Sequence, residues 1–302
     1  MTRLSIVIPV YNSAATVGRT LASLGAIALS ARSGIEVIVV DDGSADDSLA
    51  IVRRSTALVE GLSWRILTQS NKGPSAARNT ALAVAGGEWI LFLDADDKLT
   101  TDPCPFLVTA VAASCVTFAV EYVGRSGRRV RRVSPPRIGP ANNYRLLTAG
   151  NPFAVSSLVF RRAALDRPFA EDIRYAEDWE FWLANRRVFA AAARFPRTVL
   201  STIHVHGNNS SSHYRRWGLS RATVARRHLE READELRPED QNNMRVQMAV
   251  GEIQAGRQPA VRDFLHLPCD WRLWMKLGVY AGAWAVGRQA TRYAADDDSA
   301  VR

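Results

Sequence analysis

Residues 86–97 read GGEWILFLDADD and join a helix stop, an apolar run and an acidic turn. The run at 89–93 is short, uncharged and rich in bulky residues, which predicts a strand buried on both faces. The carboxylates of Asp94, Asp96 and Asp97 follow it directly. Like charges this close repel, so a counter-cation or solvent must keep them ionised. The stretch predicts either Asp94 and Asp96 holding a divalent metal that binds phosphate, or a solvated acidic turn.

Upstream of this stretch, apolar runs alternate with helical patterns. The runs predict strands at 4–10, 35–40 and 64–67, and the segments between them predict helices. Such alternation is typical of an α/β fold in which helices flank a sheet. The first hundred residues therefore predict a Rossmann-like, mostly parallel central sheet.

Polar side chains follow three of the predicted strands. They are Tyr11 with Asn12, Asp41 with Asp42, and the acidic turn at 94–97. Strand ends of a parallel sheet lie along one edge, where ligands bind, so these groups are expected to converge. No G-x-G-x-x-G follows the first strand, and no G-x-x-x-x-G-K-[ST] occurs in the chain. A dinucleotide oxidoreductase and a P-loop enzyme are therefore not supported.

The composition is typical of a globular protein, with 302 residues of which 47% are hydrophobic. No apolar run is long enough to span a bilayer. The N-terminus enters the first predicted strand without a cleavage site, and Cys104, Cys115 and Cys269 lack metal-ligand spacing. These features predict a cytoplasmic protein in a reducing compartment, with a peripheral position on the inner face of the membrane as a further expectation.

The net charge of +9 is unevenly distributed, because residues 1–100 carry −1 and the rest carries +10. Arginines cluster at 125–137 and 215–231, which can attract nucleic acid, anionic lipid or a polyphosphate substrate. The first cluster lacks interleaved aromatics, so nucleic acid is not an expected partner. Its prolines, Pro135, Pro136 and Pro140, predict an extended or mobile connection. Residues 271–293 predict a helix that either packs on the catalytic domain or lies at an anionic membrane surface.

Four segments in this order resemble the family 2 inverting glycosyltransferases of the GT-A fold. They are SIVIPVYN at 5–12, EVIVVDDGS at 36–44, NKGPSAARN at 71–79 and the stretch at 86–97. The resemblance implies a catalytic domain at 1–213, with a nucleotide-binding half at 1–100 and an acceptor-binding half at 101–213. A helical C-terminal extension is expected at 214–302.

The same resemblance implies ligand contacts, position by position. The nucleotide-sugar would be bound by Pro9, Tyr11, Asp41, Asp42, Lys72, Gly73, Arg78, Asp94 and Ala95. One of the paired acids, Asp41 or Asp42, would accept a hydrogen bond from the uracil N–H. Asp96, with Asp94, would hold the metal, and Asp96 is expected to touch it directly. Hard oxygen ligands favour Mg²⁺ or Mn²⁺.

The sequence EDWEFWL at 177–183 resembles the family's E-D-[WY]-[DE]-x-W-L element. The resemblance implies that Asp178 is the general base and that Glu177 positions the acceptor. Trp179, Trp182 and Leu183 share a helical stripe that would anchor these acids. Taken alone, the segment also fits an ordinary amphipathic helix with an acidic first turn.

Residues 204–213, HVHGNNSSSH, resemble the family's late loop that closes over the pyrophosphate, although the register departs from the usual pattern. This implies that His206 contacts the metal or the diphosphate.

These motifs predict an inverting glycosyltransferase that moves a sugar from a UDP-sugar to an acceptor hydroxyl. The expected acceptor is a glycan or a lipid-linked sugar, in cell-envelope, capsule or other polysaccharide or glycolipid synthesis. A sugar-phosphate nucleotidyltransferase would need a glycine-rich basic loop after the first strand, which residues 11–15 lack. The high net charge also fits a basic nucleic-acid-binding protein. A non-catalytic relative that only binds or scaffolds is a third competing hypothesis, and the complete set of acids argues against it.

Overall fold

The computed structural model describes residues 3–27, 34–56, 59–124, 126–205 and 214–257. These residues belong to two compact units, Met1–Asn209 and Ser210–Arg302, which we describe one at a time. Within the described residues, no helix is both long and apolar enough to cross a bilayer.

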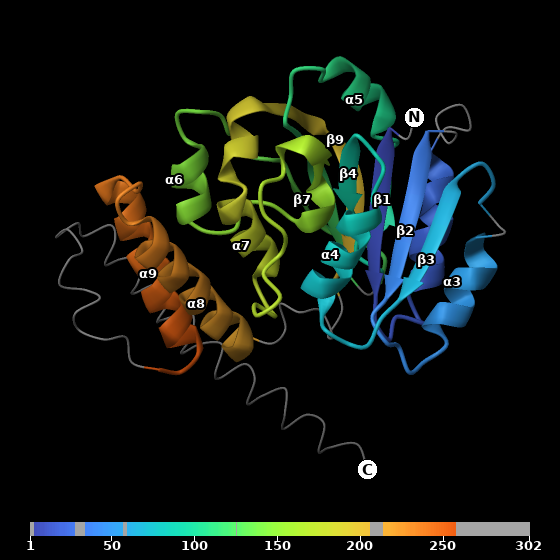
Figure 1. Cartoon of the computed structure of the whole chain (residues 1–302), viewed down its shortest axis with the longest axis horizontal. Helices are drawn as coiled ribbons and strands as arrows, with labels where there is room; N and C mark the ends of the chain where they lie inside the picture. The colour runs from blue at the N-terminus through green and yellow to red at the C-terminus, as the bar shows by residue number, and fades with distance from the viewer. Residues whose placement is uncertain (1–2, 28–33, 57–58, 125, 206–213, 258–302) are drawn as a thin grey trace, which may run out of the picture. The chain divides into compact units, whose positions relative to one another are not determined.

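The first part of the larger unit is a parallel sheet with the strand order β3-β2-β1-β4 (Figure 1). β2 and β4 are buried along their whole length, and β1 is buried at all but one position, which explains their unbroken apolar character. The predicted alternation of strands and helices is confirmed. The elements are β1 (Leu4–Val10), α1 (Val17–Ser23), β2 (Ile35–Asp41), α3 (Ser48–Thr56), β3 (Ser63–Thr68), α4 (Pro74–Val84) and β4 (Trp89–Phe92).

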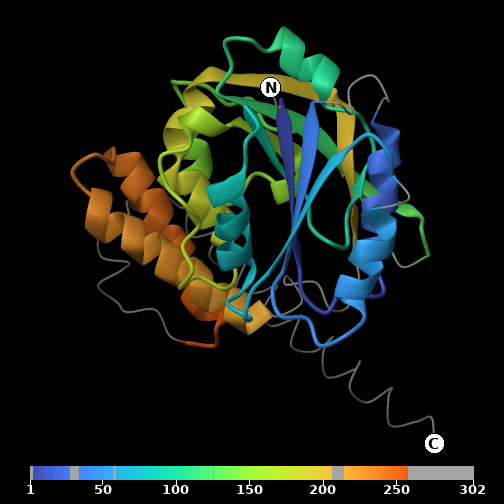
Figure 2. The same ribbon diagram turned by 45° about the vertical axis from the view of Figure 1, so that its right-hand side comes forward.

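The direction of winding reverses in the middle of this sheet. The chain moves from β1 through β2 to β3, and then returns across β1 to form β4. Because crossovers between parallel strands are right-handed, the reversal puts α4 on the opposite face from α1 and α3 (Figure 2). The carboxyl ends of β1 and β4 therefore flank a topological switch point, where α/β proteins bind ligands.

The second part of the unit extends the same sheet with mixed strand directions. β8 pairs antiparallel with β4 and β6, and β6 pairs parallel with β9. The predicted mostly parallel α/β sheet flanked by helices is thus confirmed, with antiparallel additions at one side. The further elements are β5 (Lys98–Leu99), α5 (Cys104–Thr109), β6 (Cys115–Val123), β7 (Arg129–Val133), α6 (Asn143–Thr148), η2 (Val155–Ser157), β8 (Leu158–Arg161), α7 (Glu177–Ala184) and β9 (Ala192–His204).

The arginine-rich segment contains a strand where we expected only a connection. β7, with the sequence RVRRV, pairs antiparallel with β6 and lies at the edge of the sheet. Pairing with β6 satisfies one side of its backbone, and the arginines on the edge discourage further strand addition.

The smaller unit contains α8 (Tyr214–Glu232) and α9 (Pro238–Gln254), in agreement with the predicted C-terminal helical extension. The two helices cross closely at two glycines, because a Cβ on Gly251 would lie 2.5 Å from the carbonyl oxygen of Gly218. The predicted helix at 271–293 lies outside the described residues.

Candidate active site

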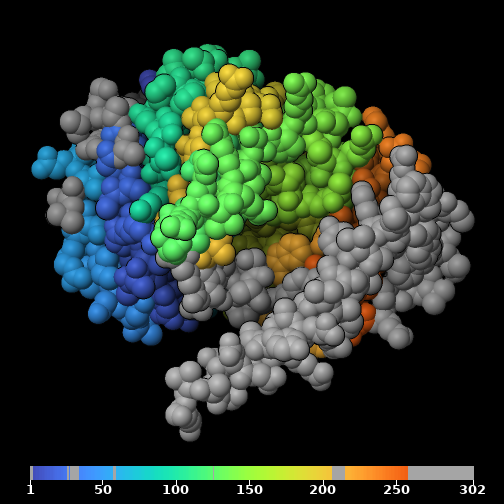
Figure 3. All heavy atoms as spheres, turned by 180° about the vertical axis from the view of Figure 1, so that it is seen from behind, coloured from blue at the N-terminus to red at the C-terminus, as the bar shows by residue number. Residues whose placement is uncertain are grey.

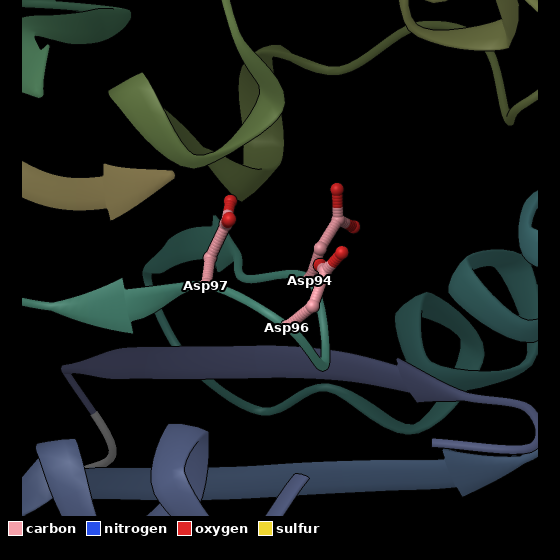
Figure 4. Close-up of side chains that lie close together, drawn as sticks. All are labelled: Asp94, Asp96 and Asp97. Carbon is pink, nitrogen blue, oxygen red and sulfur yellow. The ribbon is translucent and has the colours of Figure 1, made fainter. Parts of the chain in front are cut away.

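The acidic turn follows β4 at the switch point. Asp94, Asp96 and Asp97 each place a carboxylate oxygen within 4.8 Å of the others, and the three side chains point to the same side of the turn (Figure 4). Helix α1 fixes the turn's backbone, because Arg19 Nη2 donates to the Asp96 carbonyl at 3.0 Å and Thr20 Oγ1 to the Ala95 carbonyl at 2.9 Å. These two hydrogen bonds from α1 thus fix the backbone of the turn that carries the three carboxylates.

Asp97 is the buried member of this group. Its Oδ2 accepts a hydrogen bond from Ser156 Oγ at 2.9 Å. Burial raises the pKa of Asp97 well above its ordinary value, and the charges of Asp94 and Asp96 raise it further. A divalent cation would relieve this repulsion. The donor set consists of carboxylate oxygens alone, which fits Mg²⁺ or Mn²⁺ rather than a thiolate-binding metal.

Arg78 on α4 connects the acidic turn to the helix that carries the predicted base. Its Nη2 donates to Asp94 Oδ1 at 2.8 Å, and its Nη1 to Glu177 Oε1 at 3.1 Å. Arg78 is 3% exposed. Burial alone would lower the pKa of Arg78, but Asp94 and Glu177 raise it above its ordinary value. The guanidinium therefore stays charged and holds the two acids at a fixed spacing.

Helix α7 begins at Glu177 and is anchored by aromatic packing. Phe181 stacks on Phe169 with ring centroids 3.9 Å apart, and Trp182 stacks on Phe160 at 5.3 Å. Trp179 Nε1 donates to the Leu147 carbonyl at 2.7 Å. Residues 179–183 are all buried, so the helix is held on more sides than the predicted stripe.

Asp178, in the first turn of α7, has two fixed hydrogen-bond partners. Asn151 Nδ2 donates to its Oδ2 at 2.7 Å, and the backbone N–H of Trp179 donates to its Oδ1, also at 2.7 Å. Burial raises the pKa of Asp178 to about 7, with a further rise from Glu177, while Asn151, Trp179 and Arg78 oppose it. A carboxylate with such a pKa can take a proton from a hydroxyl near neutral pH.

The amide of Asn151 has a defined orientation. Trp182 Nε1, which can only donate, lies 3.2 Å from Asn151 Oδ1. The amide NH₂ must therefore face Asp178, where it favours the ionised carboxylate.

Asp41 and Asp42, at the end of β2, differ in how many hydrogen bonds they accept. Both oxygens of Asp42 are engaged, because it accepts from Gln69 Nε2 and from the backbone N–H groups of Lys72 and Gly73 at 2.8–2.9 Å. Asp41 Oδ2 accepts from the Ser44 N–H at 3.3 Å. Asp41 Oδ1 is buried and has no hydrogen-bond partner in the described part of the chain. Asp42 thus holds the loop at 69–73, whereas Asp41 Oδ1 is an acceptor that no described residue uses.

The remaining predicted nucleotide contacts lie around the same strand ends. Pro9 is half-buried near the end of β1, and Tyr11 follows the strand with 51% of its surface exposed. Gly73 has φ 93°, a value that favours glycine, and the loop carrying Lys72 depends on it. His206 lies outside the described residues.

Residues without a motif also shape the site. Asn151 orients Asp178, Ser156 holds Asp97, and Gln69 holds Asp42. Asn79 bonds both backbone groups of Phe169, at 2.9 Å each, which fixes the segment leading to α7. Asn79 belongs to the segment NKGPSAARN, whereas the other three carry no signal in a single sequence.

Comparisons with known proteins show what this chain is similar to. The model of the family described as glycosyl transferase family 2 matches residues 5–169. The succinoglycan biosynthesis protein ExoU of Rhizobium meliloti is 30% identical over 247 residues, which are 75% of this chain and 69% of that protein.

Two solved structures share the fold. The structure of S. aureus TarS 1–349 in complex with UDP-GlcNAc superposes with a TM-score of 0.61 at 19% identity, covering 96% of this chain and 92% of that one. The mannosyltransferase PcManGT from Pyrobaculum calidifontis, in complex with GDP-Man and Mn²⁺, gives 0.56 at 21% identity, covering 94% and 86%.

Proposed function

We propose a specific reaction from the premise that this chain belongs to glycosyl transferase family 2, as the match over residues 5–169 establishes. The protein is a nucleotide-sugar glycosyltransferase. The proposed reaction is inverting transfer from a UDP-sugar to an acceptor hydroxyl, with Asp178 as the general base. In this proposal residues 1–100 bind the donor and residues 101–213 bind the acceptor.

Each part of the site has a role in this reaction. Asp41 Oδ1 accepts the N–H of the uracil ring, and the loop carrying Lys72 and Gly73 lies beside the nucleotide. Asp96 and Asp94 would hold Mg²⁺ or Mn²⁺, and such a cation would supply positive charge beside the diphosphate leaving group. Asp178 removes the acceptor's proton on the opposite face of the sugar, so a single displacement inverts the anomeric carbon.

The observation that carries this proposal is the ion-pair bridge through Arg78. A single buried guanidinium contacts Asp94 of the acidic turn and Glu177, the neighbour of Asp178. This bridge supports a single site that includes the acidic turn and the proposed base. A solvated acidic turn or an ordinary capped helix would need no such bridge.

A donor screen tests the proposal. UDP-sugars and GDP-sugars are incubated with Mn²⁺ or with EDTA, and release of the nucleoside diphosphate is measured. We expect Mn²⁺-dependent UDP release that Asp96→Ala abolishes, because this variant removes a metal ligand. Release that persists unchanged in EDTA, or in Asp96→Ala, would contradict the metal assignment.

The wider role is proposed from the relatives. ExoU is described as a succinoglycan biosynthesis protein, and we place this chain in cell-envelope, capsule or other polysaccharide or glycolipid synthesis. The acceptor is then a glycan or a lipid-linked sugar.

A further inference from the structure

β6 carries Tyr122 on the face of the sheet that holds the catalytic acids. Val120 of β6 pairs with Ser201 of β9. Ser201 Oγ contacts Ser156 Oγ at 2.9 Å, and Ser156 donates to Asp97. Paired residues of neighbouring strands share a face, and so do residues two apart on one strand. Tyr122 therefore lies on the same face as Ser156.

The electrostatics of Tyr122 agree with this position. Burial raises the pKa of Tyr122, Arg131 lowers it, and the charges of Asp97 and Asp178 raise it. The pKa of the Tyr122 side chain thus responds to the charges of both the acidic turn and the proposed base. Because Asp178 must face the acceptor hydroxyl, Tyr122 belongs to the acceptor side of the site.

Arg131 of β7 covers this tyrosine. The two residues are directly opposite in the register, and the guanidinium carbon lies 4.3 Å from the centroid of the Tyr122 ring. Arg131 is exposed, and no carboxylate in the described part of the chain lies within ion-pair distance of it. Tyr122 holds the cation in place through its ring and through a hydrogen bond from Arg131, while the other donors of the guanidinium stay available.

A bulge in β7 separates Arg131 from its neighbour. Tyr122 pairs with Arg131, but the next residue, Val123, pairs with Arg129, so Val130 is the extra residue. The bulge turns Arg129 to the face of Glu121, to whose Oε1 its Nη1 donates at 3.3 Å. Arg129 is thereby neutralised on the opposite face, whereas Arg131 keeps its positive charge on the catalytic face. Figure 3 shows the hairpin, in green, at the molecular surface.

We propose that Arg131 binds a phosphate group of the acceptor substrate, close to the hydroxyl that Asp178 deprotonates. This inference rests on the proposed function, and it narrows the acceptor to a phosphate-bearing molecule. A guanidinium matches the geometry of phosphate with two parallel hydrogen bonds, and stacking on Tyr122 reduces the entropy lost on binding.

The phosphate can belong to a lipid-linked sugar diphosphate or to a polyol-phosphate polymer. The test compares an octyl glycoside, the matching octyl-linked sugar diphosphate and a soluble polyol-phosphate oligomer as acceptors for the wild type. We expect one phosphorylated acceptor to exceed the neutral glycoside in kcat/KM, and the better of the two identifies the source. Equal kcat/KM for neutral and phosphorylated acceptors overturns the inference.

Arg131→Gln and Arg129→Gln form a matched pair, because both residues are exposed on the same strand but face opposite sides. Arg131→Gln should lower kcat/KM for the phosphorylated acceptor by about tenfold or more, the value of one charge-assisted hydrogen bond. Arg129→Gln should leave kcat/KM for the phosphorylated acceptor near the wild-type value. Arg131→Lys, which keeps the positive charge, should retain part of this kcat/KM. Equal effects of Arg131→Gln and Arg129→Gln overturn the inference.

Two further measurements distinguish acceptor binding by Arg131 from failure of the proposed function and from binding to a membrane. Mn²⁺-dependent UDP binding and donor hydrolysis by the wild type report the proposed function itself, and their absence overturns both proposals. Binding to vesicles of anionic phospholipid is measured in parallel. If Arg131→Gln weakens vesicle binding but leaves transfer to the soluble phosphorylated acceptor unchanged, the residue serves a membrane and the acceptor assignment is wrong.

Discussion

At the residue scale, the site depends on carboxylates with different surroundings. Asp178 is half-buried, and its partial burial and the charge of Glu177 favour its protonated form, while Asn151 donates to its ionised form. The balance places its pKa at about 7. A base with this pKa is ionised for half of the molecules near neutral pH, and its conjugate acid can release the proton afterwards.

The pH profile of kcat/KM should therefore have an acidic limb with its midpoint near 7. Activity falls as the pH drops, because Asp178 must be ionised to accept a proton. Asn151→Ala removes a hydrogen bond to the ionised form, so the pKa of Asp178 rises and the limb moves to higher pH. We expect about a tenfold loss at pH 6 with recovery at high pH, measured by nucleotide release.

Asn143→Ala is the control for this variant. Asn143 is half-buried, and its Nδ2 donates to the Arg186 carbonyl at 3.3 Å rather than to Asp178. Its replacement should leave the limb in place. If the acidic limb of the pH profile stayed in place in Asn151→Ala, Asn151 would not stabilise the ionised form of Asp178.

At the scale of elements, the two glycines before β4 are not equivalent. A Cβ on Gly87 would lie 2.5 Å from the Ser5 backbone nitrogen, whereas a Cβ on Gly86 would make an ordinary 3.5 Å contact with Glu36 Oε1. The backbone N–H of Gly87 also donates to Ser5 Oγ at 2.9 Å. Gly87 is thus required by close packing between β1 and the chain that enters β4.

Gly87→Ala should lower the melting temperature by about 5 °C or more, because overpacking against backbone costs about 1–3 kcal/mol. Gly86→Ala, one position earlier, should change it far less. Thermal unfolding followed by circular dichroism measures both. Similar melting temperatures for the two variants would show that the close contact between Gly87 and the Ser5 backbone does not constrain the fold.

The elements of the first half were predictable because their signals are local. β1, β2 and β4 are apolar runs, and each is followed by the polar residues that form the site. β7 was not predictable, because RVRRV has no apolar alternation and becomes a strand only through pairing with β6. The aromatic packing of Phe181 on Phe169 likewise depends on the fold.

The difference in hydrogen bonding between Asp41 and Asp42 could not be predicted from the sequence either. The pair is adjacent in the chain, and the loop at 69–73 alone determines which of them is engaged. Asn151 and Ser156 act on acids 27 and 59 positions away in the chain, so only the folded structure connects them.

At the scale of the whole catalytic unit, distant segments meet at the point where the winding reverses. The end of β2 supplies Asp41, the end of β4 supplies the acidic turn, and α7 supplies Asp178, while Arg78 connects the last two. The antiparallel pairing of β4 with β8 extends the sheet beyond the acidic turn. In the proposed reaction, donor binding and proton removal fall on different parts of this unit.

The most direct test measures Asp178→Asn in two assays on the same preparation. UDP binding with Mn²⁺ is measured by calorimetry, and sugar transfer by nucleotide release with acceptor. We expect binding close to wild type, because Asp41 and the acidic turn are untouched. Transfer should fall by about 10²- to 10⁴-fold, the usual contribution of a general base. Near-normal transfer by Asp178→Asn would contradict its role as the base.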